Sequence, residues 1–251
     1  MRVQVLDTIE MVFQFATRFV PSNHCIFRGV IDEKYTLIPS VGRLPILKNV
    51  FEELSREKEL LKQFKMQTAL KLPCLPQNDW EWLSLAQHYG LPTRLLDWTI
   101  NPLVALYFAT NHKPEELYNN TELSDCAVYL LISHINIDSF YPQSPFSISE
   151  TLEFRAPNIS ERVVNQSGIF TVHHNIRADF DNEKLHKFII PGQLKHLIKD
   201  KLNVLGVNES AIYPGLDGIA MSIKSNCFNG ISYDLDVENT PNFAKSQING
   251  L

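Results

Sequence analysis

The sequence predicts an α+β fold in a single domain, with N-terminal helices, a small mixed or antiparallel sheet, and C-terminal helices. Helical periodicity and helix caps dominate the chain up to Thr110. Apolar runs rich in strand-forming residues are dispersed at 25–30, 126–133, 168–174 and 187–191. The chain lacks the repeated βαβ rhythm that predicts a parallel sheet.

Length and composition set the limits for this fold. The 251 residues, 44% of them hydrophobic, suffice for one large domain with a substantial core. We expect one domain over 1–251, with its core at about 25–224 and a polar tail at 226–251. The net charge of −5 provides no global basic surface of the kind that binds duplex nucleic acid.

The cysteines and the N-terminus indicate a reducing, cytoplasmic setting. The four cysteines are far apart and form no CxxC pair: Cys25, Cys74, Cys126 and Cys227. The N-terminal apolar segment contains acidic residues, which argues against a signal peptide. Since no run of about 18 apolar residues occurs, we expect no membrane span. Eight histidines are present, but without HExxH or a tight His/Cys group, so no metal site is predicted.

The first elements are a helix and a strand. Residues 5–19 fit an amphipathic helix that Pro21 ends. The run 25–30 is typical of a strand, and the alternation of a strand sets Arg28 opposite its apolar neighbours. Gly29 beside it permits close approach of a ligand or another backbone. The competing interpretation is a solvent-facing arginine before a turn.

A long helix follows at 49–71, and Pro73 closes it. Apolar residues recur at helical spacing, and charged residues occupy the remaining positions. We expect Glu57 and Glu59 to be solvated, or paired with lysines on the same helix.

Residues 80–110 organise the rest of the chain as two helices and a polar connector. Asn78 followed three residues later by Glu81 forms a capping-box signature for the first helix. Gly90 suits the left-handed position just beyond its end.

The second of these helices has an equally clear start. Asn101 can cap it, Pro102 fits its first position, and the body that follows is apolar nearly all round, so we expect it to be buried. The connector 93–99 contains Arg94 and Asp97. Because buried charges need partners, one interpretation is an Arg94–Asp97 ion pair that fixes the turn; the other is a functional site.

The C-terminal part alternates strands with an irregular segment and two helices. Residues 134–167 have little periodicity, and segments of this length are often functional loops. Residues 192–205 fit an amphipathic helix that ends at Gly206. A last helix is expected at about 214–224.

One long motif in this chain resembles a known family. The stretch AQHYGLPTRLLDWTINPLVALYFAT is similar to the signature of the FRG-domain family, and Phe27-Arg28-Gly29 is the tripeptide that names it. The likeness extends over roughly residues 25–224. It also includes Arg162, Gln166, Gly168 and Phe170, and the run Tyr213-Pro214-Gly215-Leu216-Asp217.

The order of motifs also resembles that of ADP-ribosyltransferases. Such enzymes place an Arg-Gly on a first strand, here Arg28 and Gly29. A Ser/Thr strand leading into a helix follows, here Asp97 to Thr99 and then the helix ending near Phe108. A third strand carries a catalytic glutamate. The resemblance implies NAD as the substrate. The residues expected to bind it are Arg28, Gly29, Gln87, Arg94 and Thr99, with the arginine on the pyrophosphate.

The third strand of this chain departs from the transferase pattern. Gln166 opens it, with no glutamate in the Glu-x-Glu or Gln-x-Glu arrangement. An amide can bind ribose but brings no negative charge to a cationic transition state. Glu161 or Asp97 would then supply the carboxylate. His88 is a further acid–base candidate, or a charge that caps its own helix.

Three classes of function follow from the sequence. The first is an NAD-dependent transferase acting on a macromolecular target, as a toxin or phage-defence effector. The second is a non-catalytic module that binds a nucleotide or a protein. The third is a nucleic-acid-acting enzyme that uses Arg28, His88, Arg94 and Asp97. The sequence leaves the oligomeric state open.

Overall fold

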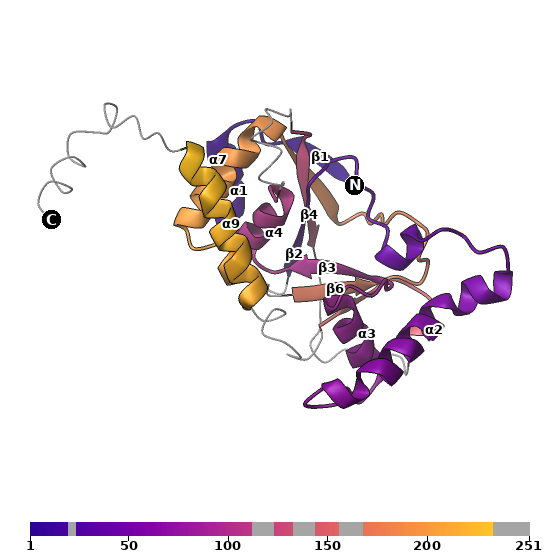
Figure 1. Ribbon diagram of the computed structural model, residues 1–251. Helices are drawn as coiled ribbons and strands as arrows, with labels where there is room; N and C mark the ends of the chain where they lie inside the picture. Colours follow the sequence, from indigo (N-terminus) through magenta and orange to yellow (C-terminus); the bar gives the residue numbers. More distant parts are fainter. Residues whose placement is uncertain (20–23, 112–122, 133–143, 156–167, 233–251) are drawn as a thin grey trace, which may run out of the picture.

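The computed structural model describes residues 1–19, 24–111, 123–132, 144–155 and 168–232 (Figure 1). In chain order, the described strands and α-helices are β1 (Arg2–Val5), α1 (Ile9–Arg18), β2 (Cys25–Val30), α2 (Val50–Thr68), α3 (Asp79–His88), β3 (Leu95–Thr99), α4 (Pro102–Ala109), β4 (Cys126–Ile132), β5 (Leu152–Phe154), β6 (Gly168–Val172), β7 (Leu185–Ile190), α7 (Lys195–Val204), α8 (Glu209–Ile212) and α9 (Leu216–Ser232).

The described strands form one seven-stranded sheet in the order β1-β7-β4-β2-β3-β6-β5. β1 pairs with β7 in parallel, and every other neighbouring pair is antiparallel. The predicted α+β class with a mixed sheet is therefore confirmed. The sheet is larger than the small sheet that the sequence predicted.

Three strands account for the difference in size. β1 runs from Arg2 to Val5, so its last residue lies within the segment predicted as the first helix. Its polar and apolar residues alternate over only four positions, and all four are exposed, so the stretch is too short to predict a strand. β5 is a three-residue edge strand inside the segment predicted as a loop. β3 occupies most of the segment 93–99, which the periodicity predicted as a connector between helices, so that prediction is wrong; the strand at Asp97 to Thr99 followed only from the transferase resemblance.

The sheet divides between β2 and β3. These two strands share one paired position, Phe27 with Thr99, whereas β2 pairs with β4 over six positions. In Figure 1, β2 and β4 run upward through the view, while β3 and β6 run across it. Beyond the single pair, the strands diverge and leave a fork between the two halves of the sheet.

Helices cover each half of the sheet separately. The helices α1, α4 and α7 pack on the half formed by β2, β4 and β7, around the buried Phe27, Val128 and Leu106. Helices α2 and α3 pack on β3, β5 and β6. A third cluster, containing Ile26 and Trp98, lies on the opposite face of the strands. The two halves therefore have separate helical covers, with the fork between them.

The predicted helix ends are confirmed. The Asn78 side chain accepts from the backbone N–H of Glu81, and the Asn101 side chain accepts from Leu103. Gly90 and Gly206 adopt the left-handed conformation, with φ of 84° and 79°. The last helix runs to Ser232, further than the expected end near residue 224, while 233–251 lie outside the described residues.

Within the part of the chain that the structure describes, none of the helices combines the length and apolar character needed to cross a bilayer.

Candidate functional site

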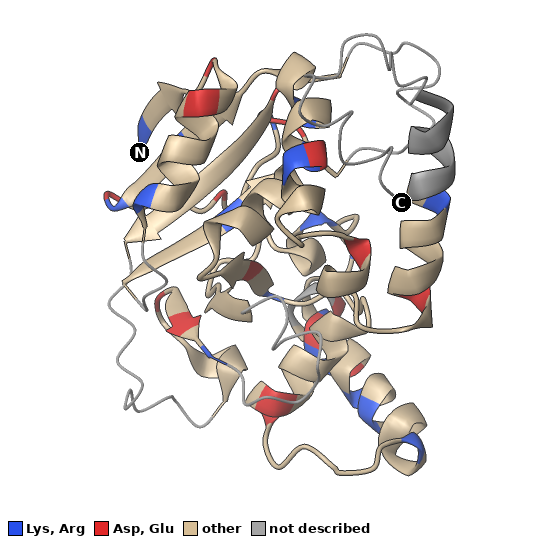
Figure 2. Cartoon of the chain, turned by 90° about the vertical axis from the view of Figure 1, so that its left-hand side faces the viewer, with Lys and Arg blue, Asp and Glu red and all other residues tan. Residues whose placement is uncertain are grey.

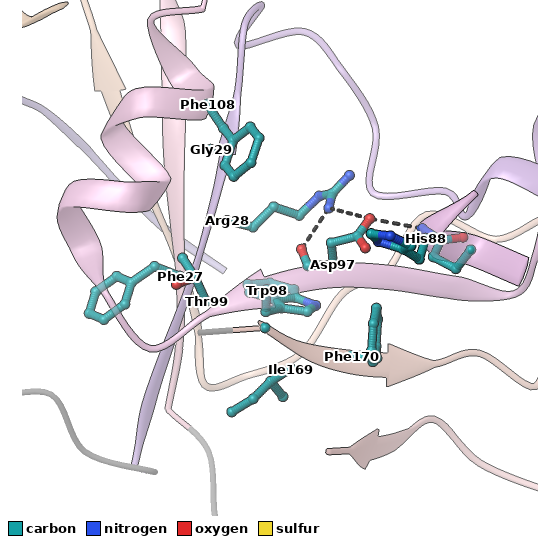
Figure 3. Close-up of a pocket in the computed structure, with 12 residues that line it drawn as sticks. Phe27, Arg28, Gly29, His88, Asp97, Trp98, Thr99, Phe108, Ile169 and Phe170 are labelled. Carbon is teal, nitrogen blue, oxygen red and sulfur yellow. Dashed lines mark hydrogen bonds and ion pairs between the residues drawn. The ribbon is translucent and has the colours of Figure 1, made fainter. Parts of the chain in front are cut away.

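A pocket of about 280 Å³ opens at the fork between β2 and β3, and we call it the fork pocket (Figure 3). Four structural units contribute its walls: each of the two halves of the sheet, the end of α3, and α4. Its lining residues are Phe27, Arg28, Gly29, Gln87, His88, Asp97, Trp98, Thr99, Phe108, Gly168, Ile169 and Phe170. Of the nine residues predicted for the site, six line this pocket.

Arg28 reaches from β2 across the fork to β3 (Figure 3). Its Nη1 donates to the backbone carbonyl of Asp97 at 2.6 Å and lies 3.8 Å from the Asp97 carboxylate. The side chain is only 20% exposed, and its Nε is fully buried with no hydrogen-bond partner among the described residues. Burial lowers the pKa of Arg28, and the nearby Asp97 charge opposes that shift. The solvent-facing interpretation of this arginine is therefore wrong.

Asp97 presents a carboxylate that is oriented and still open to solvent. Gln87 Nε2 donates to Asp97 Oδ2 at 2.8 Å, and the Thr93 hydroxyl donates to Gln87 Oε1 at 2.6 Å. The Asp97 side chain is 58% exposed. Hydrogen bonds from the end of α3 thus fix a negative charge at the pocket mouth, where a ligand can reach it.

Thr99 lines the pocket from the end of β3, and His88 lines it from the end of α3. The Thr99 hydroxyl accepts from the backbone N–H of Asn101 at 3.1 Å, so it shapes the turn that starts α4. His88 ends α3 and contacts the ring of Tyr89 edge-on, with centroids 4.9 Å apart.

Gly29 explains why α4 can lie so close to β2. A Cβ atom at this position would lie 1.9 Å from the carbonyl oxygen of Ala105 and 2.6 Å from the amide nitrogen of Ala109. Only glycine permits this approach. The sequence predicted that Gly29 lets a ligand or a backbone approach, and here the backbone of α4 does so.

Aromatic side chains form much of the remaining lining, and one of them anchors a buried polar chain. The Trp98 indole N–H donates to Thr171 Oγ1 at 2.8 Å, and that oxygen lies 2.9 Å from His173 Nε2. Which of these two atoms donates depends on the ring nitrogen of His173 that carries the proton. Burial, together with the charges of Arg28, His174 and Arg94, lowers the pKa of His173 to about 4, so the ring is neutral near pH 7.

The family comparison agrees with this geometry. The family model described as the FRG domain matches residues 23–117, which run from the start of β2 past the end of α4. Residues 23–117 are therefore similar to the FRG domain. No curated protein and no solved structure matches the chain.

The segment that matches the FRG domain contributes most of the fork pocket. It supplies β2, the end of α3, β3 and α4, and with them the arginine and the carboxylate. The rest of the lining, Gly168 to Phe170 on β6, lies outside the matched segment.

Arg94, which also lies in the matched segment, does not line the fork pocket. Its backbone N–H and its Nε donate to Glu57 at 2.7 and 2.8 Å, while Asp97 contacts Arg28 and Gln87. The predicted Arg94–Asp97 pair is therefore wrong. So is the prediction of a solvated Glu57, which is 5% exposed. Burial raises the pKa of Glu57, against the opposing effect of Arg94.

Glu161, Arg162 and Gln166 lie outside the described residues, so the structure does not place these three predicted positions. Sequence reasoning missed Thr171 and His173 as parts of the site, because their link to Trp98 depends on the pairing of β3 with β6. Among the described residues, no group of three or more His, Cys, Asp or Glu side chains could hold a metal ion.

Proposed function

We propose that the fork pocket binds NAD and that the protein transfers ADP-ribose from it to a macromolecular target. The observation that carries the proposal is Arg28, a largely buried guanidinium in the fork beside an oriented carboxylate. The order of the motifs around this arginine, which resembles that of ADP-ribosyltransferases, supports the same assignment.

The electrostatics of Arg28 favour an anionic ligand. A buried cation carries a desolvation cost. The Asp97 carboxylate offsets only part of this cost, because it lies 3.8 Å from Arg28 Nη1 and is itself exposed to solvent. A phosphate oxygen at the guanidinium would add charge-assisted hydrogen bonds. The pyrophosphate of NAD supplies such oxygens.

The size and walls of the fork pocket suit one half of the dinucleotide. A volume of about 280 Å³ is near the lower end of small-ligand pockets. The rings of Phe27, Trp98, Phe108 and Phe170 line it, and aromatic rings stack favourably on a planar heterocycle. We assign the nicotinamide riboside half to this pocket.

The transfer step would proceed at C1′ of that ribose. The bond from C1′ to the nicotinamide nitrogen breaks, and its electron pair leaves with neutral nicotinamide. Positive charge develops on the ribose until a nucleophile of the target adds its lone pair to C1′ and releases its proton. A carboxylate beside the ribose would stabilise that charge.

Asp97 is our first candidate for this carboxylate, because it lies in the fork pocket. Glu161 is the second, on sequence grounds, and Gln166 is proposed as a hydrogen-bond partner of the ribose. A transferase of this kind would suit a toxin or a phage-defence effector.

Calorimetry with NAD tests the binding half of the proposal. Wild type should release heat at millimolar NAD or below, Arg28→Ala should bind at least tenfold more weakly, and Arg28→Lys should retain part of the affinity. Arg18→Ala, an exposed arginine in the last turn of α1, is the matched control. No heat with wild type, or equal affinity in Arg28→Ala, would reject the assignment.

Labelled NAD in cell extract tests the transfer half. Wild type should label a macromolecule and release nicotinamide, and Arg28→Ala should not. Binding without labelling would favour a non-catalytic module instead. Degradation of RNA or DNA by the purified protein, with loss of that activity in His88→Ala, would favour the nucleic-acid-acting alternative.

A further inference from the structure

A second pocket, of about 430 Å³, lies where α2 meets the start of β3 and the segment after β6; we call it the basic pocket. The side chains of Arg56, Lys58, Arg94, Arg177 and His174 line it, with Phe146 among its apolar members. We propose that the basic pocket is a second binding site, for a small molecule that carries two or more phosphates, such as a nucleoside triphosphate.

The charge balance of this pocket favours an anion. Four permanently cationic side chains line it against one carboxylate among its described lining residues, Glu57. Both oxygens of Glu57 accept from Arg94, which leaves them committed within the pair. The whole chain has a net charge of −5, and Figure 2 shows acidic and basic residues interspersed over its elements. The excess of positive charge is therefore a local property of the pocket.

Neutral acceptors hold two of these cations in place. Arg177 Nη1 donates to the carbonyls of Gly42 and Leu44 at 2.8 and 2.9 Å, and Arg56 Nη2 donates to the carbonyl of Pro45 at 2.7 Å. These contacts fix the position of two guanidinium groups that line the pocket. Pre-positioned side chains reduce the ordering cost of binding a ligand.

An aromatic ring fixes two more of the cations. Lys58 Nζ lies 5.7 Å and the Arg94 guanidinium 5.0 Å from the centroid of the Phe146 ring. With Arg56, two cationic side chains of α2 and the arginine next to the start of β3 thus line one pocket. A pocket within the usual size range of small-molecule sites fits a compact polyphosphate better than a duplex, which needs an extended surface.

The basic pocket is separate from the fork pocket and does not depend on the proposed NAD site. The two pockets share no lining residue. Arg94 lines the basic pocket next to the start of β3. The fork pocket is lined by residues further along that strand: Asp97, Trp98 and Thr99.

Titration of the full chain with defined probes tests the proposal. ATP without magnesium and inorganic tripolyphosphate should both bind, adenosine should not, and added salt should weaken both interactions. Lys58→Glu should reduce both affinities by about tenfold or more. Lys62→Glu changes the same charge on the same helix, at a side chain that is 68% exposed, and should change them less than about twofold.

Five results would overturn the proposal, and the first four concern wild type and the two lysine variants. These four are no binding of either probe at millimolar concentration, equal losses in the two lysine variants, binding of adenosine as tight as that of ATP, and binding of a single-stranded RNA 12-mer without binding of ATP. Arg28→Ala should retain tripolyphosphate binding. If Arg28→Ala loses it while Lys58→Glu keeps it, the polyphosphate occupies the fork pocket and the basic pocket is no site.

Discussion

Glu57 of α2 and Arg94, next to the start of β3, form a buried ion pair with two hydrogen bonds. One carboxylate oxygen accepts from the Arg94 backbone N–H at 2.7 Å, and the other accepts from Nε at 2.8 Å. Nη1 of the same arginine donates to the carbonyl of Pro145 at 3.2 Å. One side chain thus connects a helix, a central strand and the segment before β5.

Removal of Glu57 should destabilise the fold strongly. Glu57→Ala leaves a largely buried guanidinium and a backbone N–H without their acceptor, and breaking such a pair costs about 3–5 kcal/mol. Denaturant unfolding should show this loss, while Glu59→Ala, at a carboxylate that is 53% exposed, should change stability by less than about 0.5 kcal/mol. Similar values for the two variants would contradict a structural role of the pair.

Substitution of Gly29 should separate α4 from β2. The added methyl of Gly29→Ala meets backbone atoms of α4, which cannot rotate away, so we expect a loss of about 3 kcal/mol in the free energy of unfolding. Gly90→Ala meets no atom within 4 Å and carries only the cost of its positive φ, about 1 kcal/mol. A smaller loss of unfolding free energy in Gly29→Ala than in Gly90→Ala would show that α4 can move away from β2 at little cost.

Truncation of Leu106 tests the burial of α4. The sequence predicted this leucine in the core, and it is 0% exposed. Leu106→Ala should lower the free energy of unfolding by about 2–5 kcal/mol, through lost burial and the cavity left behind. Leu70→Ala is the matched control, because Leu70 is fully exposed and should tolerate the change. A loss below about 0.5 kcal/mol at Leu106 would contradict a buried α4.

The helices could be predicted because their signals are local. Asn78, Gly90 and Asn101 define helix ends through contacts within a few residues, and each takes the predicted position. β3 has no such local signal. Its five residues place Asp97 and Thr99 among Leu95, Leu96 and Trp98, and the periodicity predicted a connector, whereas only the transferase resemblance placed a strand at Asp97 to Thr99. Its pairing with β6, about 70 residues later, decides its structure.

The polar residues of the site were predicted better than their partners. The flanking motifs already marked five polar residues as candidates. The structure places all five on the lining of one pocket: Arg28, Gln87, His88, Asp97 and Thr99. The partners of the arginines depend on distant elements: Glu57 lies 37 positions before Arg94, and Asp97 lies 69 after Arg28. Proximity in sequence suggested Arg94–Asp97, but residues three apart on a strand point to opposite faces.

Acidification should destabilise the protein through His173. Its pKa of about 4 in the folded state lies below the value of about 6.5 expected in the unfolded chain. Between these values the unfolded chain takes up a proton that the folded chain does not, so stability falls as the pH falls. The full loss, about 3 kcal/mol, is reached below the folded pKa.

The variant His173→Gln should remove this component from the pH dependence of unfolding between pH 6.5 and 4. His24→Gln is the control, since that ring is exposed and is not among the groups that shift the pKa of His173. Equal pH profiles for wild type and His173→Gln would show that His173 is not held neutral by its surroundings.

The Asp97 carboxylate should act on transfer more than on binding. Asp97→Asn keeps the shape of the side chain and an acceptor for Gln87 Nε2, but removes the negative charge beside the fork pocket. If this charge stabilises the cationic ribose, nicotinamide release should fall by about 10²–10³-fold, with NAD affinity changed by less than about threefold. Asp181→Asn, at a side chain that is 77% exposed and outside the pocket, should leave both unchanged. Unaltered nicotinamide release in Asp97→Asn would exclude Asp97 as the stabilising carboxylate, and a loss in Glu161→Ala measured alongside would assign that role to Glu161.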